Sequence, residues 1–169
     1  SGPLVWLAAR MLTGADPRNE AWDAAEMIQR DKTVRELEHA LPGDTGIVVI
    51  GSPELASQAL TARGDAEVFV ADTTGDGYGL VHRLDLNDRL AVDVPLAGLG
   101  SAVGDADLVL LETDALGPDS AICSVGSLTA AAVAAQLGTE VWLVAGVGRC
   151  LPAAMWEPLR AMVVSDEPW

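Results

Sequence analysis

The sequence predicts an α/β protein built on a Rossmann-like, doubly wound and mainly parallel sheet, with a short N-terminal helical arm. Two observations predict this class. Short, continuous apolar runs rich in Val and Leu recur along the chain, and segments with helical spacing lie between them. Such runs suit strands buried on both faces, and their alternation with helices is typical of a parallel sheet. The 169 residues suffice for one compact domain.

Five apolar runs are predicted to be strands, and three segments between them are predicted to be helices. The strands cover residues 46–51, 66–72, 90–94, 106–112 and 140–146, and the helices cover residues 53–64, 95–105 and 124–138. In the last helix Ser124 is a candidate N-cap and Gly138 a candidate C-cap. In folds of this kind, ligands bind beyond the carboxyl ends of the strands.

The first forty residues differ from the rest, because they carry helical spacing and no strand signal until Pro42 and Gly43 close them off. We therefore divide the chain into a helical arm, residues 1–43, that leans on a sheet domain, residues 44–169. No apolar run reaches the roughly 18 residues that a membrane span needs. The opening residues also lack the basic start of a secretion signal. We expect a soluble, cytoplasmic protein in which Cys123 and Cys150 are free thiols.

The formal net charge is −15, from 25 acidic and 10 basic side chains. Nucleic-acid binders neutralise phosphates with Lys and Arg, but this chain has a single lysine, Lys32, and no basic stripe. Direct nucleic-acid binding is therefore not expected. No spacing of His, Cys or carboxylates matches a metal site, and no Ser/His/Asp arrangement can be assembled. We expect neither a metal nor a cofactor.

Small polar residues follow the first two predicted strands. Gly51 and Ser52 end the first strand, and Pro53 opens a helix whose backbone N–H groups we expect to point at the crevice beyond the strands. Ser52 either hydrogen-bonds a ligand there or caps the helix. Asp72 ends the second strand, followed by Thr74 in a glycine-rich turn. Asp72 either holds a ribose or caps that turn, and no GxGxxG motif supports the first possibility.

The fourth predicted strand ends in Glu112-Thr113-Asp114. We expect the two carboxylates to point to opposite sides, so that at most one faces the crevice. A partly buried carboxylate at this place suits acid/base chemistry. The alternative is an acid that hydrogen-bonds the backbone of the following loop.

The segment from Asp107 to Gly146 resembles the C-terminal domain of the translation initiation factor 2B alpha/beta/delta family. That superfamily includes methylthioribose-1-phosphate isomerase and ribose-1,5-bisphosphate isomerase. Glu112-Thr113-Asp114 stands where the family has Gly-Ala-Asp, and the run from Cys123 to Ser127 stands where it has Asn-Lys-(Val/Ile)-Gly-Thr. An apolar strand precedes the first motif, and another follows the helix after the second.

For the isomerases, the resemblance implies metal-free aldose–ketose chemistry in which a cysteine and the aspartate of Gly-Ala-Asp move protons. Asp114 keeps the position of that aspartate. The position of the cysteine falls on or beside Ser52, whose hydroxyl is a much weaker acid than a thiol. The family's Arg-Pro step becomes Thr74-Gly75 and its Asn-Lys step becomes Cys123-Ser124. Two basic side chains that hold the phosphate are therefore missing, and the candidates to replace them are Arg83, Arg89 and Arg149.

Two functions agree with this sequence. The first is a non-catalytic, initiation factor 2B-like protein with a regulatory, ligand-binding or assembly role, whose crevice holds a small sugar-phosphate or nucleotide-like ligand. Its candidate ligand contacts are Gly51, Ser52, Asp72, Thr74, Ser124, Gly126 and Ser127. The alternative is a sugar-phosphate isomerase, an intramolecular oxidoreductase, with Asp114 as general acid/base and Ser52 and Cys123 as further catalytic candidates. The resemblance also implies a homodimer, which the apolar residues of 151–164 favour.

Overall fold

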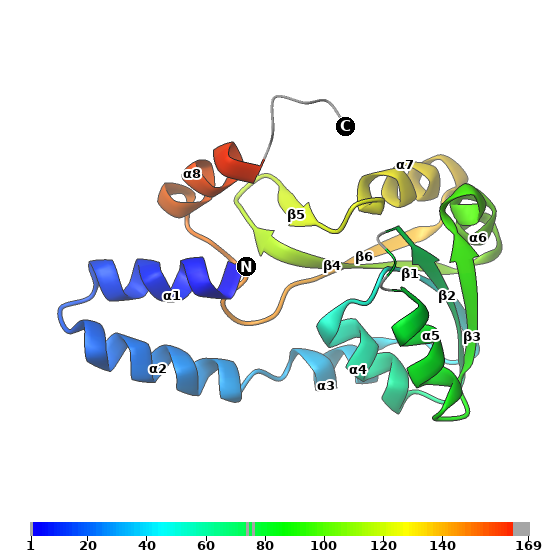
Figure 1. The fold of residues 1–169 in the computed structure, drawn as a ribbon, viewed down its shortest axis with the longest axis horizontal. Helices are drawn as coiled ribbons and strands as arrows, with labels where there is room; N and C mark the ends of the chain where they lie inside the picture. The colour runs from blue at the N-terminus through cyan, green and yellow to red at the C-terminus, as the bar shows by residue number, and fades with distance from the viewer. Residues whose placement is uncertain (1, 74, 76, 164–169) are drawn as a thin grey trace. The chain divides into compact units, whose positions relative to one another are not determined.

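The computed structural model describes residues 2–73, 75 and 77–163, and it confirms the α/β class (Figure 1). The elements in chain order are α1 (Gly2–Thr13), α2 (Pro17–Gln29), α3 (Thr33–Ala40), β1 (Thr45–Ile50), α4 (Glu54–Ala62), β2 (Ala66–Asp72), α5 (Gly77–Asp85), β3 (Leu90–Pro95), the 3-10 turn η1 (Leu96–Gly98), α6 (Leu99–Asp105), β4 (Leu108–Leu116), β5 (Ala121–Cys123), α7 (Ser127–Leu137), β6 (Glu140–Val144) and α8 (Ala153–Val163). No described helix is long and apolar enough to cross a membrane.

The described strands form one six-stranded sheet in the order β3-β2-β1-β4-β5, with β6 paired to β4. The pairs β1–β2, β1–β4, β2–β3 and β4–β6 are parallel. The five predicted strands are confirmed, and β3 lies at an edge as its weaker pattern indicated. Strand β5 was not predicted, because its three residues are too few to show a period.

Contacts divide the chain into two compact units. Unit 1 comprises Ser1–Asp31, Thr113–Ile122 and Ala145–Trp169, and unit 2 comprises Lys32–Glu112 and Cys123–Val144. Strand β4 therefore contributes its first residues to unit 2 and its last residues to unit 1. The boundary between residues 43 and 44 stays a prediction.

Unit 2 is doubly wound, because successive residues of its strands face two separate cores. On β1, Ile47 and Val49 enter one core with α3, α4 and α5, whereas Val48 and Ile50 enter the other with α6 and α7. The ribbon shows α4 and α5 on one face of the sheet and α6 and α7 on the other (Figure 1). Alternation of side chains along a strand produces this division.

Unit 1 has a smaller core built around Trp156 of α8, together with Ala115 and Leu151. The partly buried residues packed against this core are Val5, Trp6, Ile122 and Leu159. Helix α8 was not predicted as a helix, since Pro158 lies inside it and interrupts its pattern. Within unit 1, Leu116 also forms a parallel bridge with Cys150.

Helix α7 begins later than predicted. Its N-cap is Gly126, at φ 96°, rather than Ser124. The predicted C-cap is confirmed, since Gly138 lies at φ 80° and donates its N–H to Ala134. Left-handed residues at both ends set the limits of this helix, and glycine adopts that conformation without a steric cost.

Candidate functional site

The end of β1 carries an exposed hydroxyl next to a basic side chain. Gly51 turns the chain at φ 64°, and Ser52 follows it on the surface. The guanidinium Nη2 of Arg83, on α5, donates to the Ser52 Oγ over 3.3 Å. The N-cap of α4 is Pro53, which has no side-chain capping bond, so the alternative in which Ser52 caps the helix is wrong.

The N-terminus of α4 is capped by Glu112, the carboxylate that follows the buried part of β4. Its Oε2 accepts from the N–H of Leu55 at 2.8 Å and of Ala56 at 2.9 Å, and its Oε1 accepts from the N–H of Glu54 at 3.2 Å. The expectation that these N–H groups are available to a ligand is therefore wrong. A carboxylate satisfies both the unpaired N–H groups and the positive end of the helix dipole.

The end of β2 is closed by a local turn. The Oδ1 of Asp72 accepts the N–H of Gly75 at 2.6 Å, which confirms the alternative in which Asp72 caps this turn. The hydroxyl of Thr73 is buried and has no hydrogen-bond partner among the described residues. Thr74, a predicted ligand contact, lies outside the described residues.

The start of α7 meets the same end of the sheet. A Cβ atom added at Gly126 would lie 2.7 Å from Cγ2 of Thr73 and 3.6 Å from Cγ2 of Ile50. Ser124 is exposed, and its carbonyl accepts the N–H of the buried Ser127. The β1 and β2 ends are neighbours too, since the N–H of Gly51 donates to the carbonyl of Ala71.

The structure thus brings one group of predicted ligand contacts to a single end of unit 2. These residues are Gly51, Ser52, Asp72, Ser124, Gly126 and Ser127. Their role as ligand contacts stays a prediction.

Asp114 belongs to unit 1, on the part of β4 that continues to Leu116. It is exposed, whereas its neighbours Thr113 and Ala115 are buried. Because β4 runs on through this segment, Glu112 and Asp114 are two residues apart in one strand and share a side of it. The expectation that they point to opposite sides is therefore wrong. The third catalytic candidate, Cys123, is half-buried at the end of β5.

Of the three arginines considered as replacements for the family's basic residues, Arg83 contacts Ser52 at the end of β1. The Nε of Arg89 donates to the carbonyl of Thr61, which lies in the last turn of α4. Arg149 is buried in unit 1 and donates to the carbonyl of Thr113. Among the described residues, no group of three or more His, Cys, Asp or Glu side chains could hold a metal ion.

Two of these contacts were missed by sequence reasoning: the cap from Glu112 and the bond from Arg83. The first was hidden by Ser52, a suitable cap residue that directly precedes Pro53. Because the N-cap is Pro53 instead, the N–H groups of α4 require an acceptor from elsewhere. Nothing in the local sequence pairs Arg83 with Ser52, which lies 31 positions away.

No protein-family model and no curated protein matches this sequence. Solved structures do match. Translation initiation factor eIF-2B from Pyrococcus horikoshii OT3 aligns with a TM-score of 0.74 and 11% identity, over 84% of this chain and 56% of that chain. The tetrameric eIF2B-beta2-delta2 complex from C. thermophilum aligns at 0.70 and 18%, over 88% and 55%. eIF2B beta from Chaetomium thermophilum aligns at 0.68 and 15%, over 89% and 54%.

The expected resemblance is confirmed at the level of fold. At identities of 11% to 18%, these alignments show a shared fold. They do not show that the chemistry of a site is shared. The chain has the fold of eIF2B subunits and spans a little over half the length of each of these structures.

Proposed function

We propose that this protein is a non-catalytic, cytoplasmic member of the initiation factor 2B-like group that acts by assembly, as a homodimer. A weak ligand site at Ser52 and Arg83 is the remnant of a substrate site. The proposal includes no metal and no cofactor. The observation that carries it is the Glu112 carboxylate on the N-terminus of α4.

A helix N-terminus beyond a parallel strand is a common binding place for phosphate, because its N–H groups and dipole both favour an anion. In this chain the three N–H groups of α4 are already bonded to Glu112. A phosphate placed there would displace an anion and then lie beside it. The net charge of −15 adds to the repulsion. The Glu112 carboxylate and the net negative charge therefore favour a protein that no longer acts on sugar phosphates.

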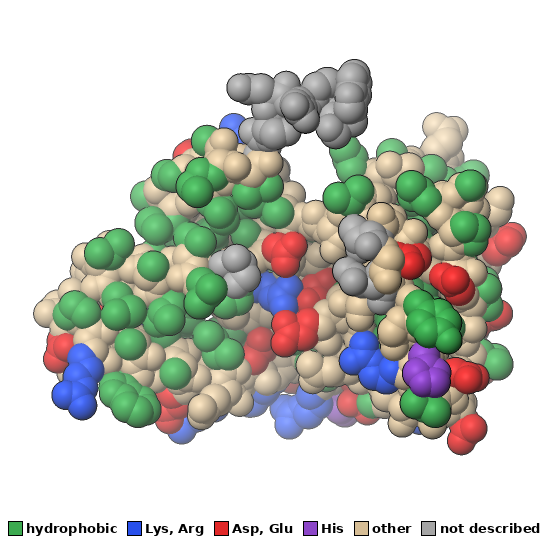
Figure 2. All heavy atoms as spheres, viewed as in Figure 1, with side chains coloured by type: hydrophobic (Ala, Val, Ile, Leu, Met, Phe, Trp, Pro, Cys, Tyr) green, Lys and Arg blue, Asp and Glu red, His purple; other side chains and the backbone are tan. Residues whose placement is uncertain are grey.

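An apolar surface on unit 2 supports assembly. Helix α7 contains no charged residue, and its Leu128 and Leu137 are 84% and 56% exposed. The neighbouring strand β6 exposes Val141 and Leu143 on the face that α7 covers in part. Hydrophobic side chains gather over α7 in the space-filling view (Figure 2). Exposed apolar side chains that lie together on one helix and its neighbouring strand are typical of a protein–protein contact.

The matched structures support assembly as well, since one of them is a tetrameric complex of beta and delta subunits. A second copy is the partner that this chain itself can supply. Two like-charged proteins associate best through a surface without charges, and the exposed side chains of Leu128, Leu137, Val141 and Leu143 offer such a surface.

Light scattering coupled to size exclusion tests assembly. We expect a dimer for the natural chain and a monomer for Leu128→Glu, since the new carboxylate would be buried against the partner. Leu86→Glu is the control, because Leu86 is 70% exposed and follows α5, on the other face of the sheet. A monomer at all concentrations for the natural chain contradicts the homodimer.

Isomerisation assays and calorimetry test the loss of catalysis. We expect no conversion of ribose 1,5-bisphosphate or methylthioribose 1-phosphate. In calorimetric titrations we also expect no heat from binding of inorganic phosphate at the N-terminus of α4. Conversion that disappears in Asp114→Asn, with the fold intact by circular dichroism, would contradict the proposal.

That outcome would establish the second candidate, an aldose–ketose isomerase with Asp114 as general acid/base. One observation favours this candidate, namely the Arg83 guanidinium beside the Ser52 hydroxyl at the end of β1. In an isomerase, Arg83 would supply the positive charge that the missing family residues no longer give. Arg83→Gln would then raise KM more than it lowers kcat.

A further inference from the structure

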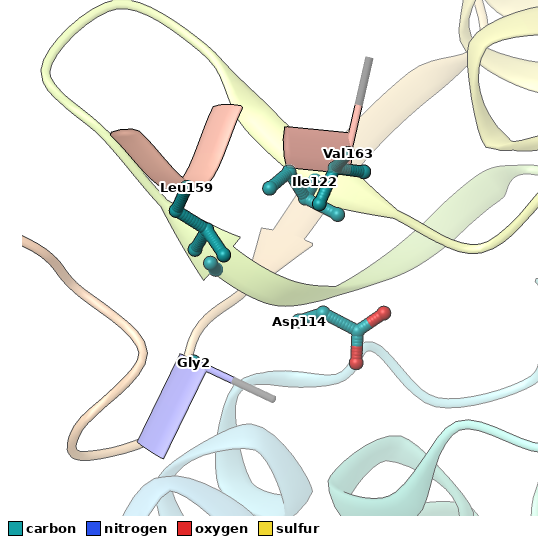
Figure 3. A pocket seen from close by; sticks show the side chains of 6 residues that line it. Gly2, Asp114, Ile122, Leu159 and Val163 are labelled. Carbon is teal, nitrogen blue, oxygen red and sulfur yellow. The ribbon is translucent and has the colours of Figure 1, made fainter. Parts of the chain in front are cut away.

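Unit 1 contains a cavity of about 300 Å³ beside the end of β4, strand β5 and helix α8. Its apolar side chains, those of Ile122, Leu159 and Val163, gather together, and the Asp114 carboxylate is directed away from them (Figure 3). The described lining therefore brings no charge to the apolar part of this cavity and selects no class of ligand. A surface of unit 2, at the edge of the sheet, is more specific.

Strand β3 lies at the edge of the sheet, where it pairs with β2 on one side and with no described strand on the other (Figure 1). Such an edge presents backbone N–H and C=O groups that have no partner in the sheet. Edges of this kind are often protected by lysine side chains or by a bulge. Strand β3 contains no lysine, and its register with β2 runs without a bulge from Leu90 to Pro95. Its backbone can therefore accept a further strand.

The two faces of β3 differ in chemistry. Leu90 and Val92 share a face with Val94, which enters the core with α6. Helix α6 leaves the first two open, since Leu90 is 71% exposed and Val92 is 41% exposed. On the opposite face Ala91 packs against the core with α4 and α5, and Asp93 is exposed. A strand added to this edge would therefore meet apolar side chains on one face and a carboxylate on the other.

The charge along this edge is negative. Asp93 forms no hydrogen bond or ion pair with a described residue. Glu67, the register partner of Leu90 on β2, exposes a second carboxylate, and both residues line a pocket of about 340 Å³. The basic residue next to β3, Arg89, is directed to α4, where its Nε donates to the carbonyl of Thr61 at 3.0 Å. A basic partner therefore gains at this edge, and an acidic one is repelled.

We propose that the free edge of β3 binds an extended segment of a partner protein, which adds a strand to the sheet and alternates apolar with basic side chains. The apolar side chains would contact Leu90 and Val92, and a Lys or Arg would pair with Asp93. A second copy is disfavoured, because it brings the same acidic strand and a net charge of −15. The site is separate from the proposed dimer surface, since β2, β1 and β4 lie between β3 and β6.

A matched set of short, capped peptides tests this site on the full chain. The first alternates valine and lysine, and the second has glutamate in place of each lysine. The third has the composition of the first, with its lysines consecutive. In fluorescence anisotropy, the alternating lysine peptide should bind at least about tenfold more tightly than the consecutive one, although both carry the same charge. The glutamate peptide should not bind.

Amide hydrogen exchange followed by NMR shows whether a strand is added. The bound peptide should slow exchange of the β3 N–H groups that face away from β2, since these groups gain acceptors. Asp93→Asn should weaken binding of the alternating lysine peptide by about threefold, as expected for one cross-strand charge pair. Asp23→Asn, at an exposed position of α2, removes the same charge and should leave binding unchanged.

Equal binding of the alternating and consecutive lysine peptides overturns the inference, because charge alone would then explain it. Unchanged exchange of the β3 N–H groups in the peptide complex has the same meaning, as does full affinity in Asp93→Asn. Protection of these groups that rises with protein concentration, without peptide, would assign the edge to a second copy and would also overturn the inference.

Discussion

Thr113 is a buried threonine whose hydroxyl has no hydrogen-bond partner among the described residues. Its carbonyl accepts from Arg149, so the backbone at this position is satisfied while the side chain is not. A buried hydroxyl without a partner costs about 1–3 kcal/mol relative to water. Thr113→Val keeps the shape and removes this group.

We expect Thr113→Val to raise the free energy of unfolding by about 1 kcal/mol in urea denaturation. Thr45→Val is the matched control, because Thr45 is also buried at a strand but donates its hydroxyl to Gly43 at 2.9 Å. That variant should lose about 1 kcal/mol. A loss in both variants would show that the Thr113 hydroxyl has a partner in solution.

Asp65 gives one pH dependence with a definite sign. Two hydrogen bonds from Arg63, each 2.8 Å, hold the pKa of this carboxyl below its ordinary value of 3.8. A lowered pKa in the folded state contributes stability above the unfolded value, and that contribution is lost as pH falls through the folded value. Asp65→Asn should therefore show a shallower loss of stability below about pH 4 in acid titrations. An unchanged acid limb would contradict the pairing.

Helix α7 offers a comparison at the scale of an element, because left-handed glycines stand at both of its ends. A Cβ at Gly138 meets nothing within 4 Å, whereas one at Gly126 lies 2.7 Å from the side chain of Thr73. Gly138→Ala should cost only the left-handed backbone, about 1–2 kcal/mol. Gly126→Ala adds a clash and should cost about 1–3 kcal/mol more.

Thermal and urea unfolding of the two variants measure this difference directly. Adding Thr73→Ser to Gly126→Ala removes the methyl group that the new Cβ would meet. The double variant should recover most of the extra cost. If the two single variants are equally destabilised, the close contact between α7 and the end of β2 is wrong.

At this same scale, the sequence predicted elements whose signal is local. The runs at β1, β2 and β4 were found because these strands are mostly buried on both faces and therefore mostly apolar. The run at β6 was found because it is apolar, although its Val141 and Leu143 are exposed. Helix α8 was missed because Pro158 breaks its pattern, and the start of α7 was misplaced because Ser124 has better cap chemistry than Gly126.

The contacts of the candidate site were harder to predict from the sequence than the elements. The Asp72 turn joins residues three apart, and its cap was among the expected alternatives. Glu112 caps a helix 56 to 58 positions away, and such a contact follows from the completed sheet and not from any neighbouring residue. For this reason the prediction that the three N–H groups of α4 are available to a ligand was wrong.

At the scale of the whole molecule, charge governs association. Each copy carries −15, so two copies repel one another through solvent even if their contact surface is uncharged. Salt screens this repulsion, since the Debye length falls from about 14 Å near 0.05 M to about 4 Å near 0.5 M. Raising NaCl over that range should lower the dissociation constant of the proposed dimer by about tenfold in sedimentation equilibrium. Weaker association at high salt would point to ion pairs across the interface.

The composition of unit 1 has a consequence for biosynthesis. Helix α1 leaves the ribosome well before Leu151 and Trp156, against which its Val5 and Trp6 pack. Unit 2 has all of its segments once residue 144 has emerged. We therefore expect a nascent chain to fold unit 2 before unit 1, since Val5 and Trp6 pack against residues that follow residue 144 in the sequence. Until Leu151 and Trp156 have emerged, the apolar side chains of Val5 and Trp6 would lack these partners.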